Sequence, residues 1–214
     1  MAGYNYFAVE GPLGAGKSRL VEALAKRTGA RIIKSPDEDN PFLKQFYRDP
    51  KHYAFQTQIF FLLARYRLLT TLFEMDLFHQ TVVSDFIFER DELYARLLLG
   101  EAELRLYHQI EQHLRRDIPK PQLVIFLQAP VEILVRNVSE RGRPFERKYL
   151  SEEFLSALSR EYIEFFFNWD TTPLLVVDTG CVDVNDSKKV NELTDYILNT
   201  QIKGTQYYSE AALF

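Results

Sequence analysis

A glycine-rich stretch near the start of the chain most constrains its fold. Residues 11–18 read GPLGAGKS, which fits the pattern G-x-x-x-x-G-K-[ST]. Residues 4–10 form an aromatic and β-branched run that predicts a buried strand, and apolar residues recur at helical spacing between Lys17 and Gly29. A strand, a glycine turn and a helix are the context in which this pattern binds phosphate, so a chance glycine turn is the weaker interpretation.

The loop predicts a site for a nucleoside triphosphate. Without side chains at Gly11, Gly14 and Gly16, successive amide N–H groups can surround the phosphates, and the following helix directs its positive end at the same anion. Lys17 is expected to bridge the β- and γ-phosphates, and Ser18 to hold Mg²⁺. The other residues expected to contact the nucleotide are Pro12, Leu13, Ala15 and Arg19.

Composition limits the class of protein. The 214 residues suffice for one α/β core, and a hydrophobic content of 46% with 14% aromatic residues excludes a disordered chain. The net charge of −4 excludes the basic field that a nucleic-acid polymer requires. A small anionic ligand held by a few local cations is compatible with this balance.

The compartment is expected to be the cytoplasm. Cys181 is the single cysteine, which excludes an internal disulfide framework and a multi-cysteine zinc site. The N-terminus lacks the pattern of a secretion signal, and Arg65 and Arg67 interrupt the longest apolar run before it reaches membrane-spanning length. We therefore expect a soluble protein with no membrane partner.

Strands and helices are predicted to alternate along the chain. The further strands are expected at residues 30–34, 81–85, 122–128 and 173–178. Helices are expected at residues 41–47, 51–77, 86–99, 101–114, 130–140, 151–169 and 187–202. This order predicts an α/β fold of the P-loop NTPase class, a single three-layer α/β/α domain with a five-stranded parallel sheet and helices on both faces. Residues 204–214 show no clear period.

Several polar segments need a partner. Residues 35–43 carry an acidic cluster, and Gln58 lies in the apolar helix 51–77, where an unpaired buried amide costs about 1–3 kcal/mol. A ligand, a protein partner or a solvated edge would each satisfy that amide.

Asp85 ends a predicted strand, at the edge where open α/β sheets bind ligands. The arginine-rich residues 141–149 predict a lid that closes over a transferring phosphate, in preference to a solvated loop.

The remaining motifs distinguish among proteins with such a loop. The GTPase signatures N-K-x-D and D-x-x-G are absent at suitable places. A nucleoside monophosphate kinase needs extra cations for the acceptor phosphate, whereas a nucleoside kinase must take a proton from a neutral 5′-hydroxyl and benefits from a nearby carboxylate. The acidic cluster at residues 35–43 favours the nucleoside kinase.

Over nearly its whole length the chain resembles the deoxynucleoside kinases, in particular their bacterial members. The matching pieces are GPLGAGKS, NPFLKQFYRDPKHYAFQTQIFFLLARYR, VVSDFIF, PKPQLVIFLQAP, RGRPFE and FFFNWDTTPLLVVDT. The resemblance implies ATP-dependent transfer of the γ-phosphoryl group to the 5′-hydroxyl of a deoxynucleoside, with Mg²⁺ and a homodimer joined through a helical face. The base stays open, because an amide such as that of Gln58 can pair with purines or pyrimidines.

The same resemblance implies roles for single residues in substrate binding. Tyr47 and Glu146 fall where the family holds the sugar 3′-hydroxyl. Gln58 falls where the family offers an amide to the base, and Arg65 matches an arginine of the base pocket.

Further matches concern the nucleotide. Arg141 and Arg143 match the lid arginines, and the turn around Asp183, residues 179–186, matches the loop that covers the adenine of ATP. Asp85 falls where a family carboxylate helps to hold Mg²⁺.

One departure concerns the general base. The glutamate that serves as base in the family falls on Ser35, which cannot accept the proton of the 5′-hydroxyl as a carboxylate does. Asp37 is our first substitute, Glu38 the second, and Asp85 a further candidate.

Other departures concern the base pocket, the lid helix and the choice of function. The family motif E-R-S reads S-D-F here, and depending on the register either Arg90 or Asp91 approaches Arg65. Asn137 stands where a lid-helix arginine is usual.

Two alternative functions stay open. One is a thymidylate kinase-like monophosphate kinase, and the other is a non-catalytic, nucleotide-binding descendant of the family. The intact Lys17 counts against the non-catalytic descendant.

Overall fold

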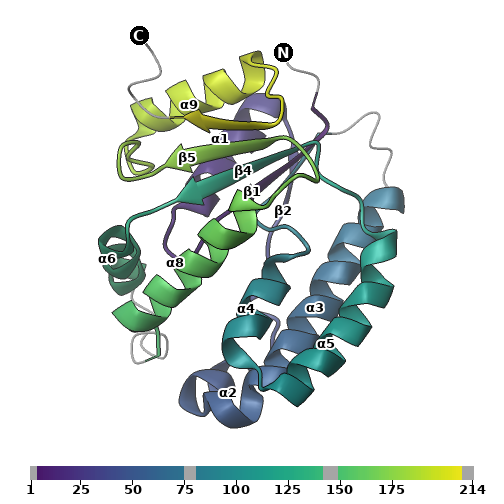
Figure 1. The fold of residues 1–214 in the computed structure, drawn as a ribbon. Helices are drawn as coiled ribbons and strands as arrows, with labels where there is room; N and C mark the ends of the chain where they lie inside the picture. The colour runs from purple at the N-terminus through teal and green to yellow at the C-terminus, as the bar shows by residue number, and fades with distance from the viewer. Residues whose placement is uncertain (1–3, 75–80, 142–148, 209–214) are drawn as a thin grey trace.

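The computed structural model describes residues 4–74, 81–141 and 149–208. Six strands form one sheet, and every strand pair is parallel (Figure 1). The strands are β1 (Tyr6–Glu10), β2 (Arg31–Ile33), β3 (Val82–Ser84), β4 (Leu123–Gln128), β5 (Leu174–Asp178) and β6 (Thr205–Tyr208). Their order is β2-β3-β1-β4-β5-β6, so β1 lies in the middle and its carboxyl end opens at the point where the strand order reverses.

Helices cover both faces of the sheet. Those of the described residues are α1 (Lys17–Thr28), α2 (Leu43–Arg48), α3 (Pro50–Glu74), α4 (Arg90–Leu98), α5 (Glu101–Leu114), the 3₁₀ turn η1 (Arg115–Asp117), α6 (Val131–Arg141), α8 (Glu152–Phe167) and α9 (Ser187–Asn199). In Figure 1, α8 crosses the near face of the sheet, while α3, α4 and α5 form a group beside it. The predicted three-layer α/β arrangement is therefore confirmed.

Alternation along the strands divides the core. Phe7 and Val9 of β1 pack with residues of α1, α6 and α9, whereas Ala8 packs with residues of α4 and α8. A central parallel strand has both faces buried, which explains the continuous apolar run of β4 in the sequence. A third cluster joins Leu62 of α3 to Tyr107 of α5 and fixes the helical group against β3.

The prediction of five strands is wrong, because β6 adds a sixth. Its residues pair with β5 at the sheet edge, with Val176 opposite Tyr207 and Val177 opposite Tyr208. Only Tyr208 is buried in β6, whereas Tyr207 remains 70% exposed. An edge strand that is solvated on one side carries too few apolar residues to produce a strand signal in the sequence.

No helix within residues 4–74, 81–141 and 149–208 combines the length and the apolar character that crossing a membrane demands.

Candidate functional site

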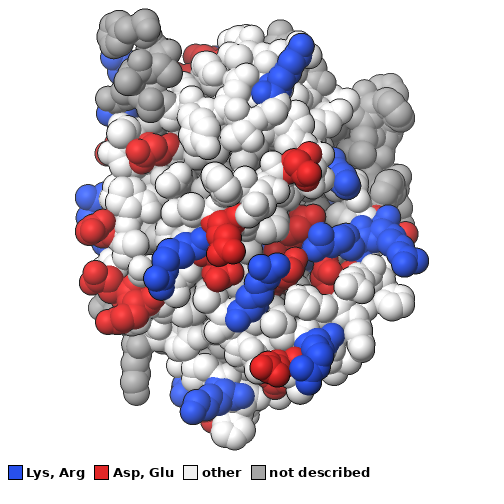
Figure 2. Space-filling view, viewed as in Figure 1, with Lys and Arg blue, Asp and Glu red and all other residues white. Residues whose placement is uncertain are grey.

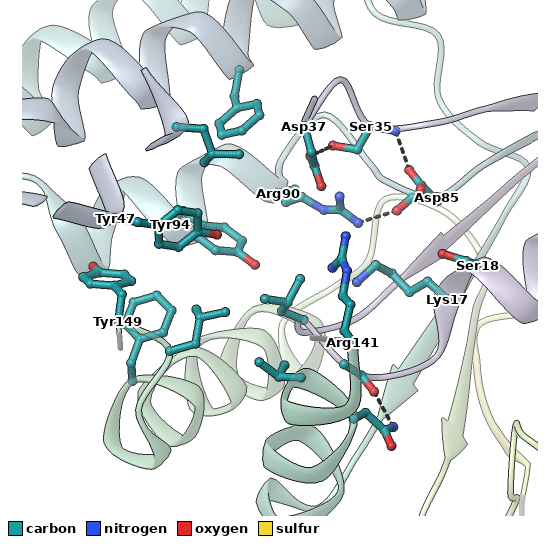
Figure 3. A pocket seen from close by; sticks show the side chains of 18 of the residues that line it. Lys17, Ser18, Ser35, Asp37, Tyr47, Asp85, Arg90, Tyr94, Arg141 and Tyr149 are labelled. Atoms are coloured by element: carbon teal, nitrogen blue, oxygen red, sulfur yellow. Dashed lines mark hydrogen bonds between the residues drawn. The ribbon is translucent and has the colours of Figure 1, made fainter. Parts of the chain in front are cut away.

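A cavity of about 510 Å³ lies at the carboxyl ends of β1 and β3. Its lining joins the glycine-rich loop on one side to α3 and α4 on the other (Figure 3). The predicted site residues that line it are Leu13, Gly14, Gly16, Lys17, Ser18, Arg19, Asp37, Tyr47, Gln58, Arg65, Asp85, Arg90, Asp91 and Arg141. Segments far apart in the sequence therefore meet in one space.

The glycines of the loop adopt a backbone that other residues rarely reach. Gly14 and Gly16 have φ angles of 91° and 92°, in the left-handed region that favours glycine. A Cβ atom on Gly14 would lie 2.9 Å from the carbonyl oxygen of Leu134, and one on Gly16 would overlap Val184. The loop is thus closely packed from behind, with its open side toward the cavity.

Lys17 folds back over the loop. Its Nζ atom donates hydrogen bonds to the carbonyl oxygens of Gly11 at 2.7 Å and Pro12 at 3.1 Å. Burial, together with the positive charge of Arg90, lowers the pKa of Lys17 to about 8. Gly11, Pro12 and Ala15 are buried beneath the loop, whereas Ser18 and Arg19 of α1 are exposed.

A buried carboxylate that no sequence pattern predicted supports the loop. Glu10 ends β1 with no exposed surface and accepts a hydrogen bond from the N–H of Gly11 at 2.9 Å. It also forms an ion pair with Arg90, at 2.8 Å from Nη2. The signal in the sequence was a charged residue at the end of an otherwise apolar strand, which burial makes costly unless it is paired.

Ser35 connects the two carboxylates that follow β2 and β3. Its backbone N–H donates to Asp85 Oδ1 at 2.7 Å, and its hydroxyl donates to Asp37 Oδ1 at 2.6 Å (Figure 3). Burial alone would raise the pKa of Asp37, but Arg65 and the hydrogen bond from Ser35 outweigh it and hold the pKa below its usual value. Glu38 is exposed and does not line the cavity.

The structure shows which residue after β3 approaches Arg65. Asp91 pairs with Arg65, and both side chains are buried, whereas Arg90 turns toward Glu10. Asp91 Oδ2 and Arg65 Nε have no hydrogen-bond partner among the described residues. Gln58 of α3 is 3% exposed and lines the same cavity. The lining of this part of the cavity therefore contains both donor and acceptor groups.

Aromatic rings form the wall opposite the loop. Tyr47 and Tyr149 lie with their ring centroids 5.8 Å apart, and Phe46 contacts both of them. Burial raises the pKa of Tyr149 to about 12, so its hydroxyl stays protonated at neutral pH. Flat apolar rings next to hydroxyl groups suit a planar, partly polar ligand.

The last turn of α6 completes the loop side of the cavity. Figure 3 shows the side chain of Arg141 reaching from α6 toward Lys17 and Arg90. Asn137, at the position of the missing lid-helix arginine, donates a hydrogen bond from Nδ2 to the carbonyl oxygen of Gly14 at 2.8 Å. Two predicted site residues, Arg143 and Glu146, lie outside the described residues.

The segment 179–186 also borders the loop. Asn185 lines the cavity and Val184 packs on Gly16, whereas Asp183 is exposed and does not line it. The Asp183 carboxylate accepts a hydrogen bond from the N–H of Asn185 at 2.8 Å and so shapes the turn. The turn therefore borders the cavity through Asn185, whereas the side chain of Asp183 does not.

The described residues form no three-residue metal cluster, and the face drawn in Figure 2 shows no basic band. Acidic and basic side chains are interspersed over the face seen in Figure 2. Among the residues the structure describes, no three His, Cys, Asp or Glu side chains are placed together to hold a metal ion. The local cations of the cavity are Lys17, Arg65, Arg90 and Arg141, with Arg19 at its edge.

Comparison with known proteins identifies the family. The family model for deoxynucleoside kinases matches residues 7–203. The deoxyguanosine kinase of Bacillus subtilis (strain 168) is 35% identical over 158 residues, which cover 73% of this chain and 76% of that protein. The deoxyguanosine kinase of Lactobacillus acidophilus is 30% identical over 198 residues, or 86% of this chain and 85% of that protein.

A solved structure agrees with this result. The deoxyadenosine kinase from M. mycoides with bound dCTP superposes with a TM-score of 0.77 at 27% identity, covering 91% of this chain and 98% of that one. With a family model that spans most of the sequence and relatives of this similarity, the chain belongs to the deoxynucleoside kinase family and is a kinase that phosphorylates deoxynucleosides.

Proposed function

We propose that this kinase transfers the γ-phosphoryl group of ATP to the 5′-hydroxyl of a deoxynucleoside. The observation that carries the proposal is one continuous cavity with two chemically different ends. One end is a glycine cradle with Lys17, which suits phosphates, and the other holds Gln58 and the Arg65–Asp91 pair, which suit a base. A substrate that spans both ends has its reacting groups in the middle.

The loop end fits a triphosphate with Mg²⁺. The cradle has no room for side chains at Gly14 and Gly16. The Nζ atom of Lys17 donates hydrogen bonds to two backbone carbonyl oxygens, and phosphate oxygens would take the place of these acceptors when a nucleotide binds. Ser18 and Asp85 line the same end and offer the oxygen ligands that Mg²⁺ prefers. When bound, Mg²⁺ would neutralise phosphate charge; the lid arginines, Arg141 and Arg143, would add to that neutralisation.

Asp37 is the proposed general base. It lines the cavity, whereas Glu38 does not, and Ser35 fixes its orientation. The low pKa of Asp37 keeps the carboxylate ionised and able to accept the proton of the 5′-hydroxyl at neutral pH. Asp85 is the second candidate, although the proposed role near Mg²⁺ would occupy its carboxylate.

Deoxyguanosine is the proposed preferred substrate. A guanine edge offers an acceptor at O6 and a donor at N1–H, which complement the unpaired Arg65 Nε and Asp91 Oδ2 and the amide of Gln58. Because other bases also carry donor–acceptor pairs, this complementarity alone does not select guanine. The choice of guanine is supported by two relatives that are deoxyguanosine kinases. Tyr47 and Glu146 are proposed to hold the 3′-hydroxyl of the sugar.

A radiolabel assay tests this function. The protein is incubated with γ-labelled ATP, Mg²⁺ and each of the four deoxynucleosides, and the same reactions are run with the four monophosphates as acceptors. We expect labelled monophosphate, with deoxyguanosine as the best acceptor. Label on the monophosphates alone would identify a monophosphate kinase, and stabilisation by nucleotide without any transfer would identify a non-catalytic protein.

A further inference from the structure

Glu10 is a fully buried carboxylate with hydrogen-bond donors from several parts of the fold. Its carboxylate has no exposed surface and accepts hydrogen bonds from four separate segments. The donors are the N–H groups of Gly11 and Ile87, each at 2.9 Å, the Tyr162 hydroxyl at 3.1 Å, and the guanidinium of Arg90. The first glycine of the loop, the segment after β3, α4 and α8 therefore meet on one negative charge.

Only one edge of the Arg90 guanidinium is used by this carboxylate. Nε lies 3.0 and 3.2 Å from the two oxygens of Glu10, and Nη2 lies 2.8 Å from Oε1. Nη2 also donates to the carbonyl oxygen of Asp85. Within residues 4–74, 81–141 and 149–208, Nη1 has no hydrogen-bond partner, although Arg90 is 6% exposed and lines the cavity.

The free edge of Arg90 lies in the cavity, among the charged side chains of the end where phosphate is expected. Figure 3 shows the guanidinium of Arg90 beside Asp85, with Asp37 on one side of it and Arg141 and Lys17 on the other. The charge of Arg90 acts on Lys17 strongly enough to be the main contribution to its low pKa after burial. Two neighbouring cations in a poorly solvated cavity repel each other, so an anion between them stabilises both.

We propose that Glu10 is a positioning residue that holds Arg90 so that its free Nη1 edge contacts the transferring phosphoryl group. The inference rests on the proposed function. Glu10 fixes the plane of the guanidinium through a two-point contact, and the same carboxylate holds the amide of Gly11. Arg90 thereby becomes a cation that is fixed in place before the phosphates bind, which is the kind of preorganised charge that lowers a barrier.

Steady-state kinetics of single variants give the first test. We expect Glu10→Gln and Arg90→Lys to lower kcat by about 10²–10³-fold, the effect of removing one preorganised donor, while KM for the deoxynucleoside changes little. The matched control is Glu111→Gln, because Glu111 is 4% exposed and paired with Arg115, and neither residue lines the cavity. Glu111→Gln should lower the melting temperature and leave kcat unchanged.

Chemical rescue separates positioning from folding. Arg90→Ala should regain activity when guanidinium ion is added at a concentration that does not unfold the protein, because Glu10 can hold the free ion in the vacated place. The double variant Glu10→Gln/Arg90→Ala should not be rescued. Equal rescue of both variants, or no rescue of Arg90→Ala, would overturn the inference. If Glu10→Gln does not fold, Glu10→Asp replaces it and should bring a partial loss of kcat.

The failures of the two proposals are distinguishable. A wild-type protein that transfers no phosphate to any deoxynucleoside refutes the proposed function. A wild-type protein that is active, together with a folded Glu10→Gln variant of equal kcat, refutes the role of Glu10 alone.

Discussion

The behaviour of Lys17 follows from its surroundings in the cavity. Its Nζ donates hydrogen bonds to the neutral carbonyl groups of Gly11 and Pro12, and burial with the nearby Arg90 lowers its pKa to about 8. A lysine with a lowered pKa is fully charged well below that pH and loses its charge as the pH rises through it. Phosphates stabilise the charged form and raise the pKa again.

We therefore predict that nucleotide binding takes up a proton near pH 8. The affinity for ADP should fall above this pH, by at most about tenfold per pH unit. Calorimetry in two buffers of different ionisation enthalpy measures the proton uptake. The Lys17→Arg variant keeps its charge at all these pH values, so its affinity should not depend on pH in this range. Equal ADP affinity of the wild type on both sides of pH 8 would contradict the low pKa.

The carboxylates near Ser35 give a second prediction. Asp37→Asn should lower kcat by about 10²–10⁴-fold, because general-base catalysis contributes that much. Glu38→Gln, one residue away and exposed, is the control and should have nearly wild-type kinetics. Since the pKa of Asp37 is held low, the base stays ionised in mild acid, and the loss of kcat/KM on acidification should occur below the ordinary carboxylate range. A strong loss in Asp85→Asn with an active Asp37→Asn would move the role to Asp85.

Among the elements, α1 begins and ends with glycines of positive φ that have different roles. Gly16 precedes the helix at φ 92° and packs against Val184. Gly29 follows the helix at φ 68°, and a Cβ atom there would meet no other atom within 4 Å. The first glycine shapes the anion cradle, and the second only ends the helix.

A pair of alanine substitutions should separate these two effects. Gly16→Ala should weaken ADP binding more than tenfold, because the added methyl group must displace Val184 and the loop. Gly29→Ala should cost about 1 kcal/mol of unfolding free energy through backbone strain alone and leave ADP binding unchanged. Urea denaturation and ADP titration of both variants measure the two effects. An unchanged ADP affinity in Gly16→Ala would show that the cradle tolerates a side chain.

Elements with strong local signals were predicted well from the sequence. The loop lies between β1 and α1 as expected, and Ser151 begins α8 by accepting a hydrogen bond from the N–H of Phe154 at 3.2 Å. The helix expected at 86–99 starts only at Arg90, because residues 85–89 form a bend and a turn, in which the N–H of Ile87 donates to Glu10, a residue distant in sequence. Contacts of this kind, like the pairing of β6 with β5, depend on tertiary structure and leave no local pattern.

Several site positions were predicted from the phosphate-binding pattern, from the resemblance and, for Asp37, from its spacing to Ser35. The structure brings Lys17, Asp37, Gln58 and Arg65 into one cavity, as expected. It also shows what the sequence left open, namely that Asp91 and not Arg90 pairs with Arg65. Which of the two residues meets Arg65 depends on the exact position at which α4 begins after β3. Hydrophobic periodicity does not determine such a boundary to a single residue.

At the scale of the whole molecule, we predict a homodimer through α3 and α5. These neighbouring helices carry Leu63 and Leu106, which are 39% and 46% exposed. Burial of such residues stabilises a helical interface, for which about 800 Å² per partner is typical. Analytical ultracentrifugation should show a dimer for the wild type and a monomer for Leu63→Glu/Leu106→Glu. Phe167→Glu, at an exposed position of α8, is the control and should remain dimeric.

Arg90 and Asp91 are consecutive residues in the first turn of α4, yet they pair with different partners, and in the proposed function they belong to the phosphate end and the base end of the cavity. A rigid turn cannot move one of them without the other. We expect that a nucleoside with a poorly matched base, by pushing on Asp91, also withdraws the guanidinium from the reacting phosphorus. Discrimination between bases would then be visible as slower turnover at saturating substrate, and not merely as weaker binding.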